Sequence, residues 1–225
     1  MKKTIYYSND NNKMNYVVYT KENADLSEMP LIIYLHGAGE RGLKVDHLSR
    51  HGIPKFLDAG REYDAVFLCP QCPCDRVWDN VVNDVKEIID KVVRELNIKK
   101  DRICITGSSM GGFGTWMMGL TFTNFFAGIA PVAGGGMSWR CGNLRSTPVL
   151  AYHGDKDSVV PPIYSELMVN RIKSFGGNAE LIVLEGYEHN DGINKAYEDE
   201  ELIFWLMKQR RTDYSEVPEA VSDCF

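Results

Sequence analysis

The segment 107–111 reads Gly-Ser-Ser-Met-Gly and matches the pattern G-x-S-x-G, with Ser109 at its centre. A short apolar run, 102–105, precedes the motif, and an expected helix, 110–120, begins within it. A serine on such a sharp strand-to-helix turn is held in a strained backbone conformation with its hydroxyl exposed. The flanking glycines allow strand and helix to approach closely. The motif therefore predicts that Ser109 is a nucleophile, the alternative being a Gly/Ser-rich turn without chemistry.

A serine hydroxyl becomes a good nucleophile when a base removes its proton, which directs attention to the five histidines. Two of them, His36 and His153, each precede a glycine at the end of an expected strand, and His47 and His51 lie in a polar segment that we expect to be helical. His189 alone follows the last expected strand, in the loop 185–191. We therefore predict that His189 is the base, the alternative being an ordinary surface-loop histidine.

A carboxylate must then orient the imidazole and stabilise its protonated form. The loop 153–161 follows an expected strand and contains Asp155 and Asp157. Asp157 directly precedes Ser158-Val159-Val160-Pro161, which would hold it in place, whereas Asp155 is adjacent to Lys156 and is more typical of a turn residue. We favour Asp157, which gives the chain order Ser, Asp, His.

Two backbone N–H groups are needed to bind the negative charge that develops on a carbonyl oxygen during acyl transfer. We expect one from Met110, at the start of the helix after Ser109, and the other from the loop His36-Gly37-Ala38-Gly39, where we favour Ala38 over Gly39.

The loop 37–42 also satisfies G-x-G-x-x-G, which suggests a dinucleotide site. The segment 40–44 has no apolar face, however, and the next expected strand, 65–68, runs into Cys69-Pro70 instead of an acidic residue. The cluster Cys69, Cys72 and Cys74 has no second Cys/His cluster to complete a zinc site. We therefore expect neither a cofactor nor a metal, and a structural role for the cysteines.

The elements that would position these residues alternate between strands and helices. Expected strands are 4–7, 14–19, 31–35, 65–68, 103–105, 128–130, 149–152 and 181–184, and expected helices are 80–96, 110–120, 161–175 and 194–210. This alternation predicts an α/β fold with a mostly parallel eight-stranded sheet covered by helices on both faces. The span between 130 and 148 is too short for a helical cap domain, so we expect an open site with a minimal cap or none.

The 225 residues are expected to form one domain, with a strand pair in residues 1–20 and a polar tail at 211–225. A net charge of −6 with interspersed signs gives no footprint for nucleic acid or for an anionic membrane. The N-terminus has no apolar run typical of a signal peptide, and the six cysteines are irregularly spaced. We therefore expect a cytoplasmic location; the oligomeric state stays open.

Together these residues resemble bacterial α/β-hydrolases identified as predicted peptidases or esterases, which are related to feruloyl, acetyl-xylan and polyhydroxybutyrate-depolymerase esterases. The matching segments are 35–42, 69–73, 105–116 and 153–161. The resemblance implies the same Ser109, Asp157 and His189 triad, and it implies that Gln71 and Trp78 line the acyl or alcohol pocket. The family often has serine and tryptophan soon after the base, whereas His189 is followed by Asn190-Asp191-Gly192. Trp139 is a further pocket candidate because, like Trp78, it lies in a loop that follows a strand.

The predicted function is hydrolysis of carboxylic esters through an acyl-enzyme, on small or sugar-linked acyl esters of the acetyl or feruloyl type. An open site suits such substrates better than lipid aggregates. The alternatives are perhydrolysis or peptide hydrolysis by the same triad, and a non-catalytic protein that uses the fold to bind a ligand.

Overall fold

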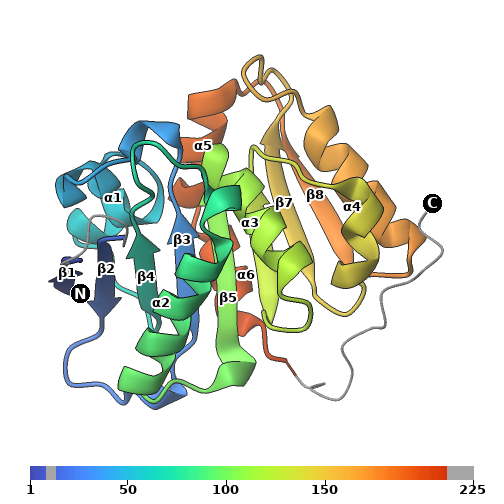
Figure 1. Cartoon of the computed structure of the whole chain (residues 1–225). Coiled ribbons are helices and arrows are strands. Elements are labelled where there is room, and N and C mark those ends of the chain that lie inside the picture. The colour runs from blue at the N-terminus through green and yellow to red at the C-terminus, as the bar shows by residue number, and fades with distance from the viewer. Residues whose placement is uncertain (9–13, 212–225) are drawn as a thin grey trace.

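The computed structural model describes residues 1–8 and 14–211. Its centre is an eight-stranded sheet in the order β1-β2-β4-β3-β5-β6-β7-β8 (Figure 1). The strands are β1 Lys2–Tyr6, β2 Tyr16–Thr20, β3 Leu31–Leu35, β4 Val66–Pro70, β5 Ile103–Ser108, β6 Gly128–Val132, β7 Val149–Gly154 and β8 Ala179–Leu184. The N-terminal pair β1 and β2 is antiparallel, β2 is antiparallel to β4, and all the other neighbours are parallel. The predicted mostly parallel eight-stranded sheet is therefore confirmed.

Strand register determines which loops meet at the carboxyl edge of the sheet. Leu35, the last residue of β3, pairs with Gly107 near the end of β5. Ser108 pairs with Val132 at the end of β6, and Gly154 at the end of β7 pairs with Leu184. Because parallel strands end at the same edge, the loops that carry the predicted site residues lie next to one another.

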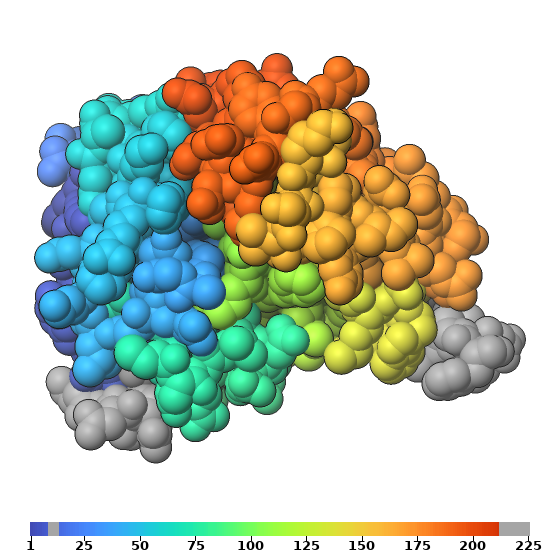
Figure 2. Space-filling model, turned by 90° about the horizontal axis from the view of Figure 1, so that it is seen from above, coloured from blue at the N-terminus to red at the C-terminus, as the bar shows by residue number. Residues whose placement is uncertain are grey.

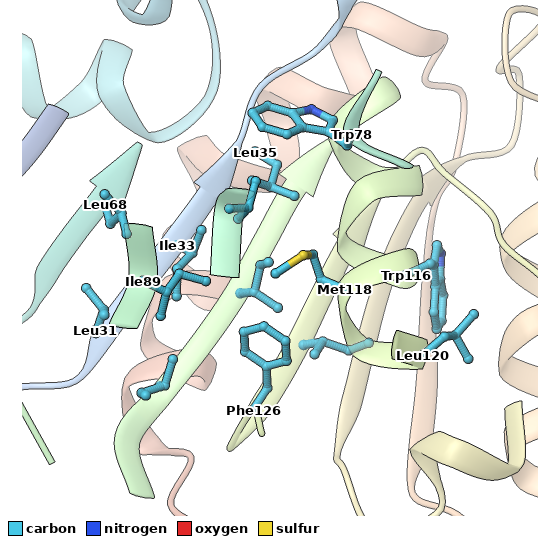
Figure 3. Close-up of a cluster of buried hydrophobic side chains, with 14 of the residues drawn as sticks. Leu31, Ile33, Leu35, Leu68, Trp78, Ile89, Trp116, Met118, Leu120 and Phe126 are labelled. Carbon is cyan, nitrogen blue, oxygen red and sulfur yellow. The ribbon is translucent and has the colours of Figure 1, made fainter. Parts of the chain in front are cut away.

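Helices cover both faces of the sheet, as the alternation of elements predicts (Figure 1). They are α1 Gly52–Asp58, α2 Val82–Glu95, α3 Met110–Thr121, α4 Ile163–Ser174, α5 His189–Glu198 and α6 Glu201–Lys208. Buried side chains of α2, α3 and α4 belong to one hydrophobic cluster, and those of α1, α5 and α6 belong to the other. Alternate residues of β3 supply both clusters, since Leu31, Ile33 and Leu35 face the first and Ile32 and Tyr34 the second. Figure 3 shows part of the first cluster, with Trp78 above Leu35.

The C-terminal helical region differs from its prediction. Instead of one helix over 194–210, α5 begins five residues earlier, at His189, and is separated from α6 by Asp199 and Glu200. Glu200 has a left-handed backbone, with φ of 62°. Arg61 Nη1 donates a hydrogen bond of 2.9 Å to the carbonyl of Glu198, and Tyr63 Oη donates one of 2.7 Å to Glu200 Oε1. These tertiary contacts stabilise the break between the two helices, and periodicity alone does not reveal them.

The predicted polar tail, 211–225, is described only at its first residue. Arg211 is buried, and its N–H donates a hydrogen bond of 2.7 Å to the carbonyl of Asp101; residues 212–225 lie outside the described part of the chain. Within residues 1–8 and 14–211, no helix is both long and apolar enough to cross a membrane.

Candidate active site

Ser109 occupies the turn between β5 and α3 with a strained backbone, φ 55° and ψ −118°. Two backbone hydrogen bonds hold the turn: the Ser109 N–H donates to the carbonyl of Val132 at 3.0 Å, and the Phe113 N–H donates to the carbonyl of Ser109 at 3.0 Å. A non-glycine residue at positive φ persists only when its surroundings enforce it. The sheet on one side and the helix on the other provide that enforcement.

The two glycines of the motif are required by close approach of backbone segments. A Cβ at Gly111 would lie 1.8 Å from the carbonyl oxygen of Leu35, and one at Gly107 would lie 2.6 Å from the same oxygen. The neighbouring Gly112 meets the carbonyl of Val132, where a Cβ would lie at 2.4 Å. The first turn of α3 is therefore packed directly against the ends of β3 and β6, which fixes the height of Ser109 above the sheet.

His189, the first residue of α5, lies next to the serine. Its Nε2 is 2.9 Å from Ser109 Oγ, and its Nδ1 is 2.6 Å from Asp157 Oδ2. The end of β7 carries the acidic loop and packs against the loop before α5, since a Cβ at Gly154 would lie 2.3 Å from the carbonyl oxygen of Tyr187. The three residues singled out from the sequence, Ser109, Asp157 and His189, thus form one hydrogen-bonded chain.

Asp157 is held as a hydrogen-bond acceptor. Its Oδ1 accepts from the N–H groups of Val159 at 3.0 Å and Val160 at 2.8 Å, and the residue is buried. Its Oδ2 therefore faces His189 as a carboxylate oxygen, so Nδ1 carries the imidazole proton and Nε2 is left to accept the proton of Ser109 Oγ. Asp155, the alternative acid, instead accepts from the N–H of Gly186 at 2.6 Å.

A second imidazole lies behind the acid. His153 Nε2 is 2.8 Å from the carbonyl oxygen of Val160 and 3.3 Å from Asp157 Oδ2, and its Nδ1 is 2.8 Å from Ser165 Oγ. Burial lowers the pKa of His153 below its ordinary value. This histidine helps to hold the loop 157–160, and its place within β7 separates it from Ser109.

The loop after β3 faces Ser109 with its backbone. A Cβ at Gly37 would lie 3.8 Å from Ser109 Cβ, and Ala38 begins the 3-10 turn Ala38–Glu40. Met110 is the first residue of α3, where unpaired N–H groups and the helix dipole favour negative charge. The N–H groups of Ala38 and Met110 therefore come from the two segments that border the serine.

His36 fixes the start of that loop. Its Nδ1 donates to the carbonyl of Gly37 at 2.6 Å, and its Nε2 accepts from the N–H of Cys72 at 2.9 Å. Both bonds are made at once only by the neutral imidazole, in agreement with burial, which lowers the pKa of His36 to about 4. The 3.8 Å separation from Glu40 Oε2 is consequently not an ion pair.

A cavity of about 210 Å³ opens beside the serine. It is lined by Gly37, Ala38, Gly39, Glu40, His51, Ser108, Ser109, His189, Asn190 and Ile193. Figure 2 views this edge of the sheet from above, where the loop after β3, the start of α3 and α5 converge. Sequence reasoning missed Glu40 and His51 as wall residues. The sequence carries no clear signal for either residue, because glutamate and histidine in loops are ordinarily exposed.

The three predicted pocket residues lie outside the wall of this cavity, and their contact with substrate stays a prediction. Gln71 is buried, and its Nε2 donates to the carbonyls of Glu40 at 2.9 Å and Lys44 at 2.8 Å. Trp78 is also buried (Figure 3), and its Nε1 donates a hydrogen bond of 2.9 Å to the carbonyl of His36. Both side chains therefore brace the loop after β3 from behind. Trp139 is 51 % exposed, and none of the three belongs to the cavity wall.

The cysteine-rich loop has a structural environment. Cys69 and Cys72 are buried, and burial raises the pKa of the Cys72 thiol to about 12. Within the described residues, no three His, Cys, Asp or Glu side chains are grouped so as to hold a metal ion.

Comparison with known proteins places this geometry in context. Residues 63–195, more than half of the chain, match the profile of the phospholipase/carboxylesterase family. A solved thermostable esterase superposes with a TM-score of 0.82 at 28 % identity, over 93 % of this chain and 63 % of its own. A feruloyl esterase module from Clostridium thermocellum, solved as a mutant with sinapinate, has the same fold, with a TM-score of 0.72 at 14 % identity over 96 % of this chain and 91 % of its own.

Curated relatives match short segments. A poly(3-hydroxyalkanoate) depolymerase from Paucimonas lemoignei is 39 % identical over 51 residues, which are 23 % of this chain and 12 % of the relative. A bifunctional acetylxylan esterase/xylanase from Neocallimastix patriciarum is 33 % identical over 76 residues, 34 % of this chain and 11 % of the relative. Each match thus spans only about a tenth of the relative's length. With the matched profile, the sheet topology and the similarity to solved esterases, the chain belongs to the phospholipase/carboxylesterase family of α/β-hydrolases.

Proposed function

We propose that this protein hydrolyses carboxylic esters through an acyl-enzyme formed on Ser109. The observation that carries the proposal is the continuous hydrogen-bond chain from Asp157 Oδ2 through His189 to Ser109 Oγ, with separations of 2.6 and 2.9 Å. Such a chain activates a hydroxyl that is otherwise a weak nucleophile. Membership in a family of phospholipases and carboxylesterases supports the same class of reaction.

In the first half of the reaction, His189 Nε2 takes the proton of Ser109 Oγ as the oxygen bonds to the ester carbonyl carbon. The carbonyl oxygen becomes an oxyanion, which the N–H groups of Ala38 and Met110 would stabilise. The C–O bond to the alcohol then breaks, and His189 returns the proton to the departing oxygen. In the second half, water replaces the alcohol, His189 again acts as base, and the carboxylic acid leaves as Ser109 regains its proton. Asp157 stays ionised throughout and stabilises the imidazolium.

The substrates we propose are small or sugar-linked acyl esters. A cavity of about 210 Å³ beside Ser109 is small, and its wall combines apolar surface with the polar side chains of Glu40, His51 and Asn190. The feruloyl esterase module and the acetylxylan esterase among the similar proteins support this range, as does the depolymerase for simple acyl esters. A cytoplasmic location remains a prediction from the sequence.

Replacement of the nucleophile tests the mechanism. Ser109→Ala should lower kcat for 4-nitrophenyl acetate by about 10⁴- to 10⁶-fold, because only oxyanion stabilisation and substrate binding remain. The double variant with His189→Ala should have nearly the same kcat as Ser109→Ala, since the triad acts as a unit. Stopped assays with purified protein, together with labelling by a serine-directed phosphonate, measure both effects.

Ser108→Ala is the matched control. Its Oγ is 3.1 Å from Tyr34 Oη, on the side of the turn opposite to α3. Ser108→Ala should therefore lower kcat far less than Ser109→Ala does. Turnover by Ser109→Ala within tenfold of the wild type would refute the proposed mechanism.

A further inference from the structure

Glu40 is a buried carboxylate in the wall of the cavity that contains Ser109 and His189. Its side chain is only 5 % exposed. A buried carboxylate is expensive unless hydrogen-bond donors satisfy it. Glu40 takes no part in the acyl-transfer steps carried out by Ser109, His189 and Asp157.

The surroundings of Glu40 leave room for a donor from a ligand. Its Oε2 is 3.8 Å from His36 Nδ1, whose proton is already given to the carbonyl of Gly37. Its Oε1 is 3.7 Å from Nε2 of His51, a half-exposed residue at the start of α1 that also lines the cavity. Both separations exceed a hydrogen bond. Burial raises the pKa of Glu40, while His51, Arg50 and the backbone N–H groups of Glu40 and Gly37 act in the opposite direction. The backbone groups do not use all the acceptor positions of the carboxylate, which therefore has room for a further donor.

We infer that Glu40 and His51 form a subsite for a hydroxyl-bearing part of the substrate, such as a sugar or another polyol, next to the scissile ester. Asn190 supplies a further amide to the same wall. Hydroxyl groups can donate to the carboxylate and accept from the imidazole or amide, which an alkyl chain cannot do. This inference rests on the proposed ester hydrolysis and adds a specificity to it.

The charges near the subsite favour a neutral polyol over a cation. Arg41 follows Glu40 in the chain and Arg50 precedes His51, and the positive charge of Arg50 acts to lower the pKa of Glu40. An ammonium group entering the cavity would meet the carboxylate together with these positive neighbours. A hydroxyl gains the hydrogen bond without that opposing charge.

Two acetates with the same scissile bond give the test. Both 6-O-acetylglucose and hexyl acetate release a primary six-carbon alcohol, and only the sugar has free hydroxyl groups. The wild type should have the higher kcat/KM for 6-O-acetylglucose, and Glu40→Gln should reduce the ratio of the two values by about tenfold or more, as expected when a hydrogen bond to a charged group is lost. The ratio is the readout because a general loss of activity cancels from it. Acetylcholine is the cationic arm, and it should not be preferred over hexyl acetate.

Asp46→Asn is the matched control, because it removes a carboxylate from an exposed position in the neighbouring segment Val45–Arg50, outside the cavity wall. It should leave the ratio unchanged. His51→Ala should also lower the ratio. Because His51 is half-exposed, this variant should fold, and it provides the test if Glu40→Gln does not fold.

The outcomes separate the two proposals. Loss of 4-nitrophenyl acetate hydrolysis only in Ser109→Ala upholds the esterase mechanism whatever happens at the subsite. An unchanged acetate ratio in both Glu40→Gln and His51→Ala, or a wild-type preference for acetylcholine, would overturn the polyol subsite while leaving the mechanism intact.

Discussion

The neutral state of His36 links the site to acid stability. The imidazole donates to Gly37 and accepts from Cys72, so a second proton would break the bond to Cys72. The unfolded chain binds that proton at the ordinary pKa of histidine, roughly 6.5, whereas the folded protein resists it until about 4. Between these two values the unfolded state holds more protons, and the free energy of unfolding therefore falls as the pH is lowered through this window.

From His36 we expect a loss of about 3 kcal/mol between pH 6.5 and pH 4. Urea unfolding at a series of pH values measures it, with His36→Gln as the comparison because glutamine keeps a donor and an acceptor without titrating. The variant should have a shallower pH dependence than the wild type. The buried His153 contributes in both proteins and so does not affect the difference. Parallel pH dependences would contradict the assignment of a neutral His36.

At the scale of elements, the contact between α3 and β3 is the tightest constraint on the nucleophile. A Cβ on Gly111 would lie 1.8 Å from the carbonyl oxygen of Leu35, and backbone atoms on both sides prevent relief by a side-chain rotation. Gly111→Ala should therefore lower the free energy of unfolding by about 3 kcal/mol or more. Chemical denaturation followed by circular dichroism measures the change.

Gly39→Ala provides the comparison, because a Cβ there would meet no atom within 4 Å. Its stability should stay within about 0.5 kcal/mol of the wild type. Equal stabilities for the two alanine variants would show that α3 is not held against β3 as described.

The elements also show which predictions a sequence supports. The strands and the helices α2, α3 and α4 follow from apolar runs, helical periodicity and glycine or proline at their ends, because burial against the sheet dictates those patterns. The start of α5 at His189 and the break at Glu200 depend on Arg61 and Tyr63, which are distant in sequence. Local patterns do not contain that information.

The site residues also separate into those that local sequence patterns indicate and those that depend on tertiary contacts. Ser109, Asp157 and His189 were predictable because strand ends and the G-x-S-x-G turn determine where their loops must meet. Whether Gln71 and Trp78 contact substrate depends on side-chain direction, which a sequence pattern does not contain; in the structure both donate hydrogen bonds to the loop after β3. The buried Glu40 was unpredicted because acidic residues in a loop are ordinarily exposed.

For the whole molecule, the two hydrophobic clusters are faces of one sheet. Trp78 and Trp116 report on the first cluster, and the thiols of Cys69 and Cys104 on the second. Because both clusters depend on the same strands, urea should expose all four side chains in one cooperative transition. Because Trp205 packs against the second cluster and Trp139 is exposed, the fluorescence is measured with both changed to phenylalanine. That fluorescence and pulsed alkylation of Cys69 and Cys104, located by mass spectrometry, measure the two faces separately. Midpoints that differ beyond error would show that one face can unfold while the other persists.

The loop 72–76 has a practical consequence of its own. Among the described cysteines, Cys74 is exposed, whereas Cys69, Cys72, Cys104 and Cys141 are buried. Its loop is tied to the segment that borders Ser109, since the Gly42 N–H donates to the carbonyl of Cys72 at 3.0 Å and a Cβ at Gly42 would touch Cys74 Sγ at 3.0 Å. With Cys224 changed to serine, an environment-sensitive maleimide dye on Cys74 would turn this connection into an optical sensor. A change in its emission on addition of an unlabelled natural ester would show that the loop responds to substrate, without the need for a chromogenic leaving group.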